Sequence, residues 1–144
     1  MHIYVSVTGD LFHYGHVAFF KSARAFGTSL TVGVCSNADV SEYKRKPIMS
    51  LAERVSVIGA CKYVDEIIPA APAATSAAFI HKHDIDLVVA TKAYSKVTLN
   101  RYYSDPLRLN ILKLVDYTDN ISTTEIIRRC YDAYTSTNGS LGQL

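Results

Sequence analysis

The stretch HIYVSVTGDLFHYGHVAFF, residues 2–20, decides which class of fold this chain can adopt. Residues 2–7 are short, β-branched and nearly all apolar, which is typical of a strand buried on both faces. Residues 8–10 predict a turn. Apolar side chains then recur every three or four positions over residues 14–26, as in an amphipathic helix, with Gly27 as the expected C-cap. A buried strand therefore passes directly into a helix.

The rest of the chain repeats this alternation. Further strands are expected at residues 30–35, 64–68, 86–90 and 110–115, and further helices at 50–61, 73–82 and 122–134. Ser50 and Ser122 are expected to cap two of these helices, and Pro69 and Pro72 to mark a loop. Residues 36–50 form a long polar segment, a length that is uncommon in loops without a function. The pattern predicts a three-layer α/β/α fold with a parallel sheet of about five strands.

Composition narrows the classes of function. With 144 residues, 49% hydrophobic content and a net charge of +2, the chain is expected to fold as one domain over residues 1–135, followed by a flexible tail over 136–144. The charge is too small for a protein that tracks a nucleic-acid backbone, so no nucleic-acid partner is expected. Three cysteines without CxxC spacing favour a reducing compartment, and no signal peptide or membrane span is apparent. A cytoplasmic protein without membrane insertion is expected.

A pair of histidines marks the first candidate site. Ligands of such sheets bind beyond the carboxyl ends of the strands, which here means residues 7–16, 36–50, 90–100 and 117–123. His13 and His16 flank Gly15 where the first strand passes into a helix, and a helix N-terminus favours phosphate. The alternatives are that both rings only cap or pack, or that they bind zinc, for which no third ligand is near. Their place in the first strand-to-helix turn favours an anion site.

Two more segments add groups suited to phosphate. Lys44, Arg45 and Lys46 precede a proline and can clamp a polyphosphate, although a solvated run of charge is an equal alternative. The sequence Ile-Ser-Thr-Thr at residues 121–124 brings three hydroxyls to the start of the last helix, more than capping requires. Imidazoles, cations, hydroxyls and two helix N-termini around one crevice indicate a site for a nucleoside triphosphate.

The motifs resemble those of the HxGH nucleotidyltransferase superfamily, and within it the small cytidylyltransferases that act on glycerol 3-phosphate, phosphocholine or phosphoethanolamine. The resemblance runs from Tyr4 to about Tyr134 and is carried by five motifs in order: DLFHYGH at 10–16, GVCS at 33–36, ER at 53–54, YVDEII at 63–68 and ISTTEII at 121–127. It implies a Rossmann-like domain that transfers CMP from CTP to a small phosphorylated alcohol with Mg²⁺ present. Pyrophosphate would be released, and the product would be a CDP-activated precursor. Family members commonly form homodimers, so a homodimer is expected.

The resemblance also implies roles for individual residues. His13, His16 and Lys46 (or Lys44, since the loop alignment is ambiguous) would act in catalysis by stabilising charge on the phosphates. Asp10, Lys92 and Tyr94 would contact the acceptor, with Asp10 near the substrate or the metal ion, which would come with CTP rather than sit in a protein-ligated site. The nucleotide would be bound by Thr8, Gly9, Gly15, Lys44, Arg54, Ile121, Ser122, Thr123 and Thr124.

Departures from the family pattern bear on the acceptor. Lys92 stands where these enzymes often carry acidic residues, Tyr117 lies in the segment where an arginine is usual, and Gly9 is displaced along the first loop. A cation in the acceptor pocket would repel choline or ethanolamine, which favours glycerol 3-phosphate or another anionic acceptor. Two alternatives stay open: an adenylyltransferase that uses ATP on a cofactor precursor such as flavin mononucleotide, and a nucleotide-binding module that regulates a partner without catalysis.

Overall fold

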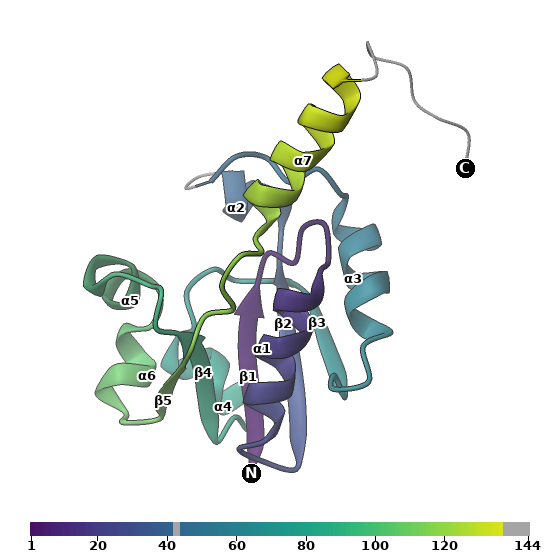
Figure 1. Ribbon diagram of the computed structural model, residues 1–144. Helices are drawn as coiled ribbons and strands as arrows, with labels where there is room; N and C mark the ends of the chain where they lie inside the picture. Colours follow the sequence, from purple (N-terminus) through teal and green to yellow (C-terminus); the bar gives the residue numbers. More distant parts are fainter. Residues whose placement is uncertain (42–43, 137–144) are drawn as a thin grey trace.

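A computed structural model describes residues 1–41 and 44–136 and arranges them as one parallel sheet between two layers of helices (Figure 1). The strands are β1 (His2–Val7), β2 (Ser29–Cys35), β3 (Glu66–Ala71), β4 (Leu87–Thr91) and β5 (Leu112–Val115). The helices are α1 (Tyr14–Arg24), α2 (Asn37–Ser41), α3 (Leu51–Gly59), α4 (Ala77–Lys82), α5 (Lys96–Tyr102), α6 (Ser104–Arg108) and α7 (Thr123–Ser136). The predicted fold class is confirmed.

The order of the strands creates a crevice next to β1. The sheet runs β3-β2-β1-β4-β5, so the chain first builds outward through β2 and β3 and then returns to the other side of β1. β1 pairs with β2 from His2↔Ser29 to Val7↔Val34, whereas its recorded pairs with β4 are Ile3↔Leu87 and Tyr4↔Val88. The point where the strand order reverses is the topological switch point of the sheet. The loops that follow the two neighbouring strands run in opposite directions there, which leaves a crevice in which ligands bind.

The core forms on both faces of the sheet because successive side chains of a strand alternate. On one face Ile3 and Val5 are fully buried against Phe20 of α1 and Ile58 of α3. On the other face a second cluster unites Tyr4 with Val88, Ile80 and Tyr103. β1 is therefore covered on both sides, as its apolar sequence predicts, and it holds the loop that follows it in a fixed place.

Several boundaries differ from the sequence predictions. α1 ends at the cap residue Ala25, and Gly27 has a different role: a Cβ there would lie 2.3 Å from the Met1 carbonyl oxygen, so the close chain crossing requires glycine. Pro69 lies inside β3 instead of in a loop, which is possible because β3 is an edge strand. The short helices α2, α5 and α6 were not predicted.

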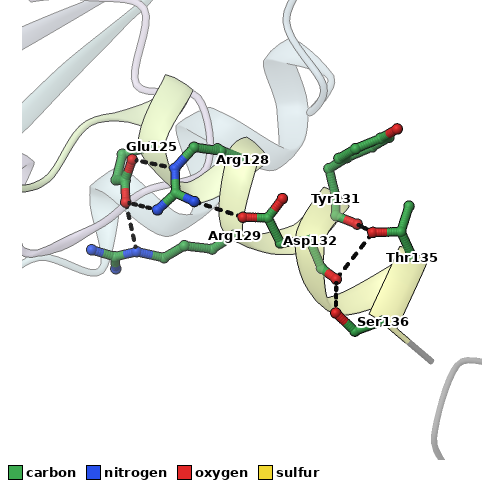
Figure 2. Close-up of polar contacts among 7 residues, drawn as sticks. All are labelled: Glu125, Arg128, Arg129, Tyr131, Asp132, Thr135 and Ser136. Atoms are coloured by element: carbon green, nitrogen blue, oxygen red, sulfur yellow. Dashed lines mark hydrogen bonds and ion pairs between the residues drawn. The ribbon is translucent and has the colours of Figure 1, made fainter.

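Helix α7 extends from the carboxyl edge of the sheet away from the body of the molecule (Figure 1), and none of its residues is buried. Figure 2 shows polar contacts along its surface: the Glu125 carboxylate accepts from Arg128 and Arg129, and Arg128 also pairs with Asp132. The predicted flexible tail begins at Ser136, the last residue of α7, and its remaining residues lie outside the described ones. Among the helices that the structure describes, none has the length and apolar character needed to span a bilayer.

Candidate active site

Two adjoining cavities open at the carboxyl ends of the strands, where the switch point predicts a ligand. The first has a volume of about 500 Å³ and is lined from all four of the predicted loop regions, by residues between positions 7–19, 40–47, 91–94 and 116–124. The second has a volume of about 330 Å³ and shares Val7, Thr8, Lys44 and Tyr94 with the first. Two ligands bound in these cavities would therefore be neighbours.

His13 and His16 form a reciprocal cap at the start of α1. His13 is the N-cap residue, and its Nδ1 accepts from the Gly15 N–H at 3.1 Å. The His13 N–H in turn donates to His16 Nδ1 at 3.1 Å, and the two ring centroids lie 3.9 Å apart. Since both Nδ1 atoms accept hydrogen bonds, each neutral ring carries its proton on Nε2. The capping alternative is thus true and still leaves two Nε2–H donors on rings that line the first cavity.

The environment keeps both rings neutral. Burial lowers the pKa of His16 to about 3, with smaller contributions that lower it from His13 and raise it from Asp10. Burial also lowers the pKa of His13. Neutral imidazoles that donate from fixed positions can stabilise charge that develops on phosphate oxygens, without first releasing a proton.

The two glycines of this loop are required by the space around them. At Gly15 a Cβ would lie 2.8 Å from Cε1 of His13 and 3.0 Å from Cγ2 of Ile121, so a side chain there would displace the imidazole. Gly9 has a φ of +71° and faces Ile58, whose Cδ1 would be 2.3 Å from a Cβ. The displaced glycine of the sequence thus serves a left-handed turn directly beneath the first cavity.

Asp10 holds three segments together at the edge of the first cavity. Its carboxylate accepts from the backbone N–H groups of Ile48 at 2.8 Å and Met49 at 2.9 Å, and it is 5% exposed. Its carbonyl oxygen accepts from the Thr123 hydroxyl at 2.9 Å. The structure therefore gives Asp10 a positioning role in addition to its place in the cavity wall, and a contact with substrate or metal ion stays a prediction.

The three hydroxyls of the Ile-Ser-Thr-Thr segment have three different partners. Thr123 donates to Asp10, as described. Ser122 Oγ accepts from the Glu125 N–H at 3.0 Å, as the predicted cap requires, and Thr124 Oγ1 accepts from Arg45 Nη1 at 3.2 Å. A hydroxyl that accepts keeps its own proton as a donor, so Ser122 and Thr124 can each donate to a phosphate oxygen. All three residues line the first cavity, as does Ile121.

The structure resolves which basic residues of the second loop reach the site. Lys44 and Arg45 line the first cavity, and Lys44 lines the second as well. The prediction that Lys46 acts in catalysis is not supported by its position, because it lines neither cavity. The protein around the Lys44 ammonium removes part of its hydration and lowers its pKa, which favours an anionic ligand as its neighbour.

Arg54 was predicted to bind the nucleotide, and the structure shows a different role. Its side chain is completely buried and lines neither cavity. The guanidinium donates to the carbonyl oxygens of Thr8 at 2.6 Å, Cys35 at 2.9 Å and Met49 at 3.3 Å, and to the side-chain oxygen of Asn37. It ties the ends of β1 and β2 to the start of α3, so it shapes the cavity from behind.

Lys92 was predicted to contact the acceptor, and the structure places it outside both cavities. Its side chain is 60% exposed, pairs with Asp116 at 2.7 Å and lines neither cavity. Lys92 lies in the turn that follows β4, where the Tyr94 N–H donates to the Thr91 carbonyl oxygen at 3.3 Å; Thr91 and Ala93 line the first cavity and Lys92 does not. Its position therefore gives no support to the argument that Lys92 repels a cationic head group. Tyr94 lines both cavities, and its contact with the acceptor stays a prediction.

Sequence reasoning missed part of the site. Asp116, Thr118 and Thr91 line the first cavity, and Arg101 with Tyr103 lines the second. Thr91 and Thr118 lie inside the ligand-binding regions expected from the sequence, 90–100 and 117–123, although neither was singled out, and Asp116 directly follows β5. Arg101 and Tyr103 belong to or follow α5, a helix whose sequence gives no clear periodic signal.

The described residues include no cluster of three or more His, Cys, Asp or Glu side chains that could hold a metal ion by themselves. Among the described residues, the acidic ones that line the first cavity are Asp10, whose carboxylate also accepts from two backbone N–H groups, and Asp116, which also pairs with the exposed Lys92. Mg²⁺ is commonly held by one or two carboxylates together with substrate phosphates, and these residues fit that arrangement.

Comparison with known proteins agrees with this geometry. A family model described as cytidylyltransferase-like matches residues 8–129, which include the histidine pair and the Ile-Ser-Thr-Thr segment. The chain belongs to the cytidylyltransferase-like family. The expectation drawn from the motifs is therefore confirmed at the level of the family.

Relatives of this cytidylyltransferase-like chain are named for amino-alcohol phosphates. It is 39% identical to an ethanolamine-phosphate cytidylyltransferase of Arabidopsis thaliana, which aligns with 94% of the chain and 34% of the relative. It is 38% identical to the enzyme of the same name from Dictyostelium discoideum, over 90% of the chain and 38% of the relative. For choline-phosphate cytidylyltransferase A of Homo sapiens the identity is 32%, over 94% and 39%. The chain thus spans about a third of the length of these curated relatives.

A solved structure supports the architecture alone. The lipopolysaccharide core biosynthesis protein from Thermoplasma volcanium GSS1 superimposes with a TM-score of 0.64 at 19% identity, covering 82% of this chain and 96% of that one. The similarity confirms the Rossmann-like fold of the cytidylyltransferase-like chain.

Proposed function

We propose that this chain transfers CMP from CTP to the phosphate of a small phosphorylated alcohol and releases pyrophosphate. The observation that carries the proposal is the reciprocal cap of His13 and His16, which leaves an Nε2–H donor on each ring; both residues line a cavity that Lys44 and residues 122–124 also line. The family and the names of the relatives support the choice of cytidylyl transfer.

The reaction needs charge stabilisation more than acid–base chemistry. A phosphate oxygen of the acceptor attacks the α-phosphorus of CTP, the bond from that phosphorus to the α–β bridging oxygen breaks, and pyrophosphate leaves with the electron pair. No proton has to move. Donors fixed around the α- and β-phosphates therefore lower the barrier directly, and His13 and His16 are the residues best placed to supply them.

Mg²⁺ is part of the proposal. It would arrive with the triphosphate, be held chiefly by phosphate oxygens and water, and neutralise charge on the leaving group. Asp10 and Asp116 are the carboxylates that would complete its shell. A homodimer is part of the proposal as well.

The identity of the acceptor is a separate part of the proposal. The relatives' names put phosphoethanolamine and phosphocholine among the acceptors to test, and the sequence adds glycerol 3-phosphate. The common feature of these molecules is a phosphate monoester on a short alcohol.

Pyrophosphate release measured with Mg²⁺, CTP or ATP, and each of these acceptors tests the proposal. CTP-dependent release with at least one acceptor is expected. Release with ATP and not with CTP would replace the nucleotide assignment, and binding of CTP without release for any acceptor would support a regulatory module instead. A variant in which Asn replaces His16 serves as the control for contaminating activity.

A further inference from the structure

The second cavity lies beside the proposed CTP site. It shares Thr8 and Lys44 with the first cavity, so a phosphate placed at this boundary can reach the α-phosphorus of a nucleotide in the first. Its volume of about 330 Å³ is sufficient for a small head group. It is therefore the place where the alcohol part of the acceptor fits.

The charges in its wall are all positive. Among the described residues that line the second cavity, Lys44 and Arg101 carry charge and none is acidic. Three buried residues belong to the described part of the wall, and two of them, Ser6 at 7% and Cys35 at 2% exposure, are called here the floor; Ser6 Oγ lies 3.4 Å from Cys35 Sγ, and the third is Tyr103 at 4%. Burial raises the pKa of the Cys35 thiol, so the floor is polar and uncharged.

The aromatic rings of this cavity do not form a site for an ammonium group. The Arg101 guanidinium lies over the ring of Tyr102, 5.2 Å from its centroid. The rings of Tyr94 and Tyr103 stack on each other, 5.9 Å apart at 27°. The Tyr102 ring therefore already contacts a cation, and Tyr94 and Tyr103 each cover one face of the other. An ammonium group in this cavity would meet the positive charge of Arg101 in place of an open aromatic surface.

We propose that the second cavity binds the head group of the acceptor and selects an uncharged, hydroxyl-bearing alcohol phosphate, such as glycerol 3-phosphate, over amino-alcohol phosphates. The inference rests on the proposed transfer reaction. An ammonium would lose hydration beside Lys44 and Arg101 and find no carboxylate to replace it, whereas hydroxyls can exchange hydrogen bonds with the floor. The preference that the sequence attributed to Lys92 thus rests on other residues.

Competition between acceptors measures the selection. The ratio of kcat/KM for glycerol 3-phosphate to that for phosphoethanolamine, with CTP and Mg²⁺, is expected to be at least about tenfold, equivalent to about 1.4 kcal/mol. A ratio of one or less, or a preference for phosphocholine, would overturn the inference and leave cytidylyl transfer intact.

Variants locate the selection in this cavity. Arg101→Glu should shift the ratio by at least about tenfold toward phosphoethanolamine, because it replaces a cation by a carboxylate in the cavity wall. Lys96→Glu, an equal change of charge on the same helix but outside both cavities, should leave the ratio within about twofold. Ser6→Asp should act in the same direction from the floor. Equal ratios in Arg101→Glu and Lys96→Glu would refute the assignment.

Direct binding separates this inference from the proposed function. Calorimetric titration of the full chain with glycerol 3-phosphate and with phosphoethanolamine needs no turnover. Tighter binding of glycerol 3-phosphate that Arg101→Glu reduces would support the cavity assignment even if no pyrophosphate is released. Equal affinities, or binding of neither molecule, would refute it.

Discussion

The role of Arg54 yields the sharpest quantitative prediction, because the sequence and the structure disagree about it. If Arg54 fixes the ends of β1 and β2 to α3, then replacing it should destabilise the empty protein. If it contacts the nucleotide, the same change should weaken CTP binding and leave the stability of the empty protein unchanged. Arg54→Lys distinguishes the two roles, because it keeps the positive charge.

The size of the effect follows from the hydrogen bonds. The guanidinium donates to three backbone carbonyls and to Asn37, from three nitrogen atoms that lie in one plane. A lysine ammonium is a single point and can keep about two of these partners. A hydrogen bond to a charged group contributes about 1.5–3 kcal/mol, so the loss of two predicts a decrease in unfolding free energy of about 3 kcal/mol or more.

Urea unfolding without nucleotide is the assay. With an m-value of about 1.5 kcal/mol per molar urea, the midpoint should fall by about 2 M. Arg108→Lys is the matched control, because Arg108 is exposed and its recorded partner is Asp105 alone; a change within about 0.5 kcal/mol is expected. An Arg54→Lys midpoint equal to that of the control, combined with a raised KM for CTP, would refute the positioning role.

Four further predictions concern the first cavity and its edge. His16→Asn keeps an acceptor for the His13 N–H but removes the Nε2–H donor, so kcat should fall by about a hundredfold with the fold retained; a kcat within twofold of wild type would contradict this. In the unfolded chain His16 binds a proton near its usual pKa of 6.5, whereas in the folded protein its pKa is about 3. The free energy of unfolding should therefore decline as the pH falls from about 6.5 to about 3. An NMR titration in which the folded His16 ring is protonated near pH 6.5 would contradict its burial. Gly15→Ala should displace the His13 ring, so it should lower kcat strongly and the free energy of unfolding only slightly. Lys92→Asp should leave the order of acceptor preference unchanged. A shift of that preference toward phosphoethanolamine would show that Lys92 contacts the acceptor.

The parts of the site that the sequence predicted are those set by local structure. His13, Gly15 and His16 occupy a strand-to-helix turn, and a buried strand followed by an amphipathic helix fixes where that turn lies. Ser122 is similarly tied to the start of a helix by its cap. Local patterns determined these positions without knowledge of the remaining chain.

The site residues whose positions differ from the sequence predictions are those that depend on contacts between distant segments. Nothing local to Arg54 reveals that three carbonyls from separate segments surround it, and residues 36–50 lack a periodicity that would distinguish Lys44 from Lys46. Lys92 was assigned by its position in a motif, yet it lies in the turn after β4 and pairs with Asp116, which follows the distant strand β5. The second cavity was missed because one side of its wall comes from α5, which the sequence did not predict.

One measurement tests the central claim most directly: ³¹P NMR of CTP, Mg²⁺ and the acceptors, with the wild-type chain and with His16→Asn. The account predicts that the resonances of pyrophosphate and of a pyrophosphate diester grow together in equal amounts with the wild-type chain and are reduced about a hundredfold with the variant. Formation of CDP and inorganic phosphate, or undiminished turnover in the variant, would contradict the claim that His13 and His16 promote transfer at the α-phosphorus.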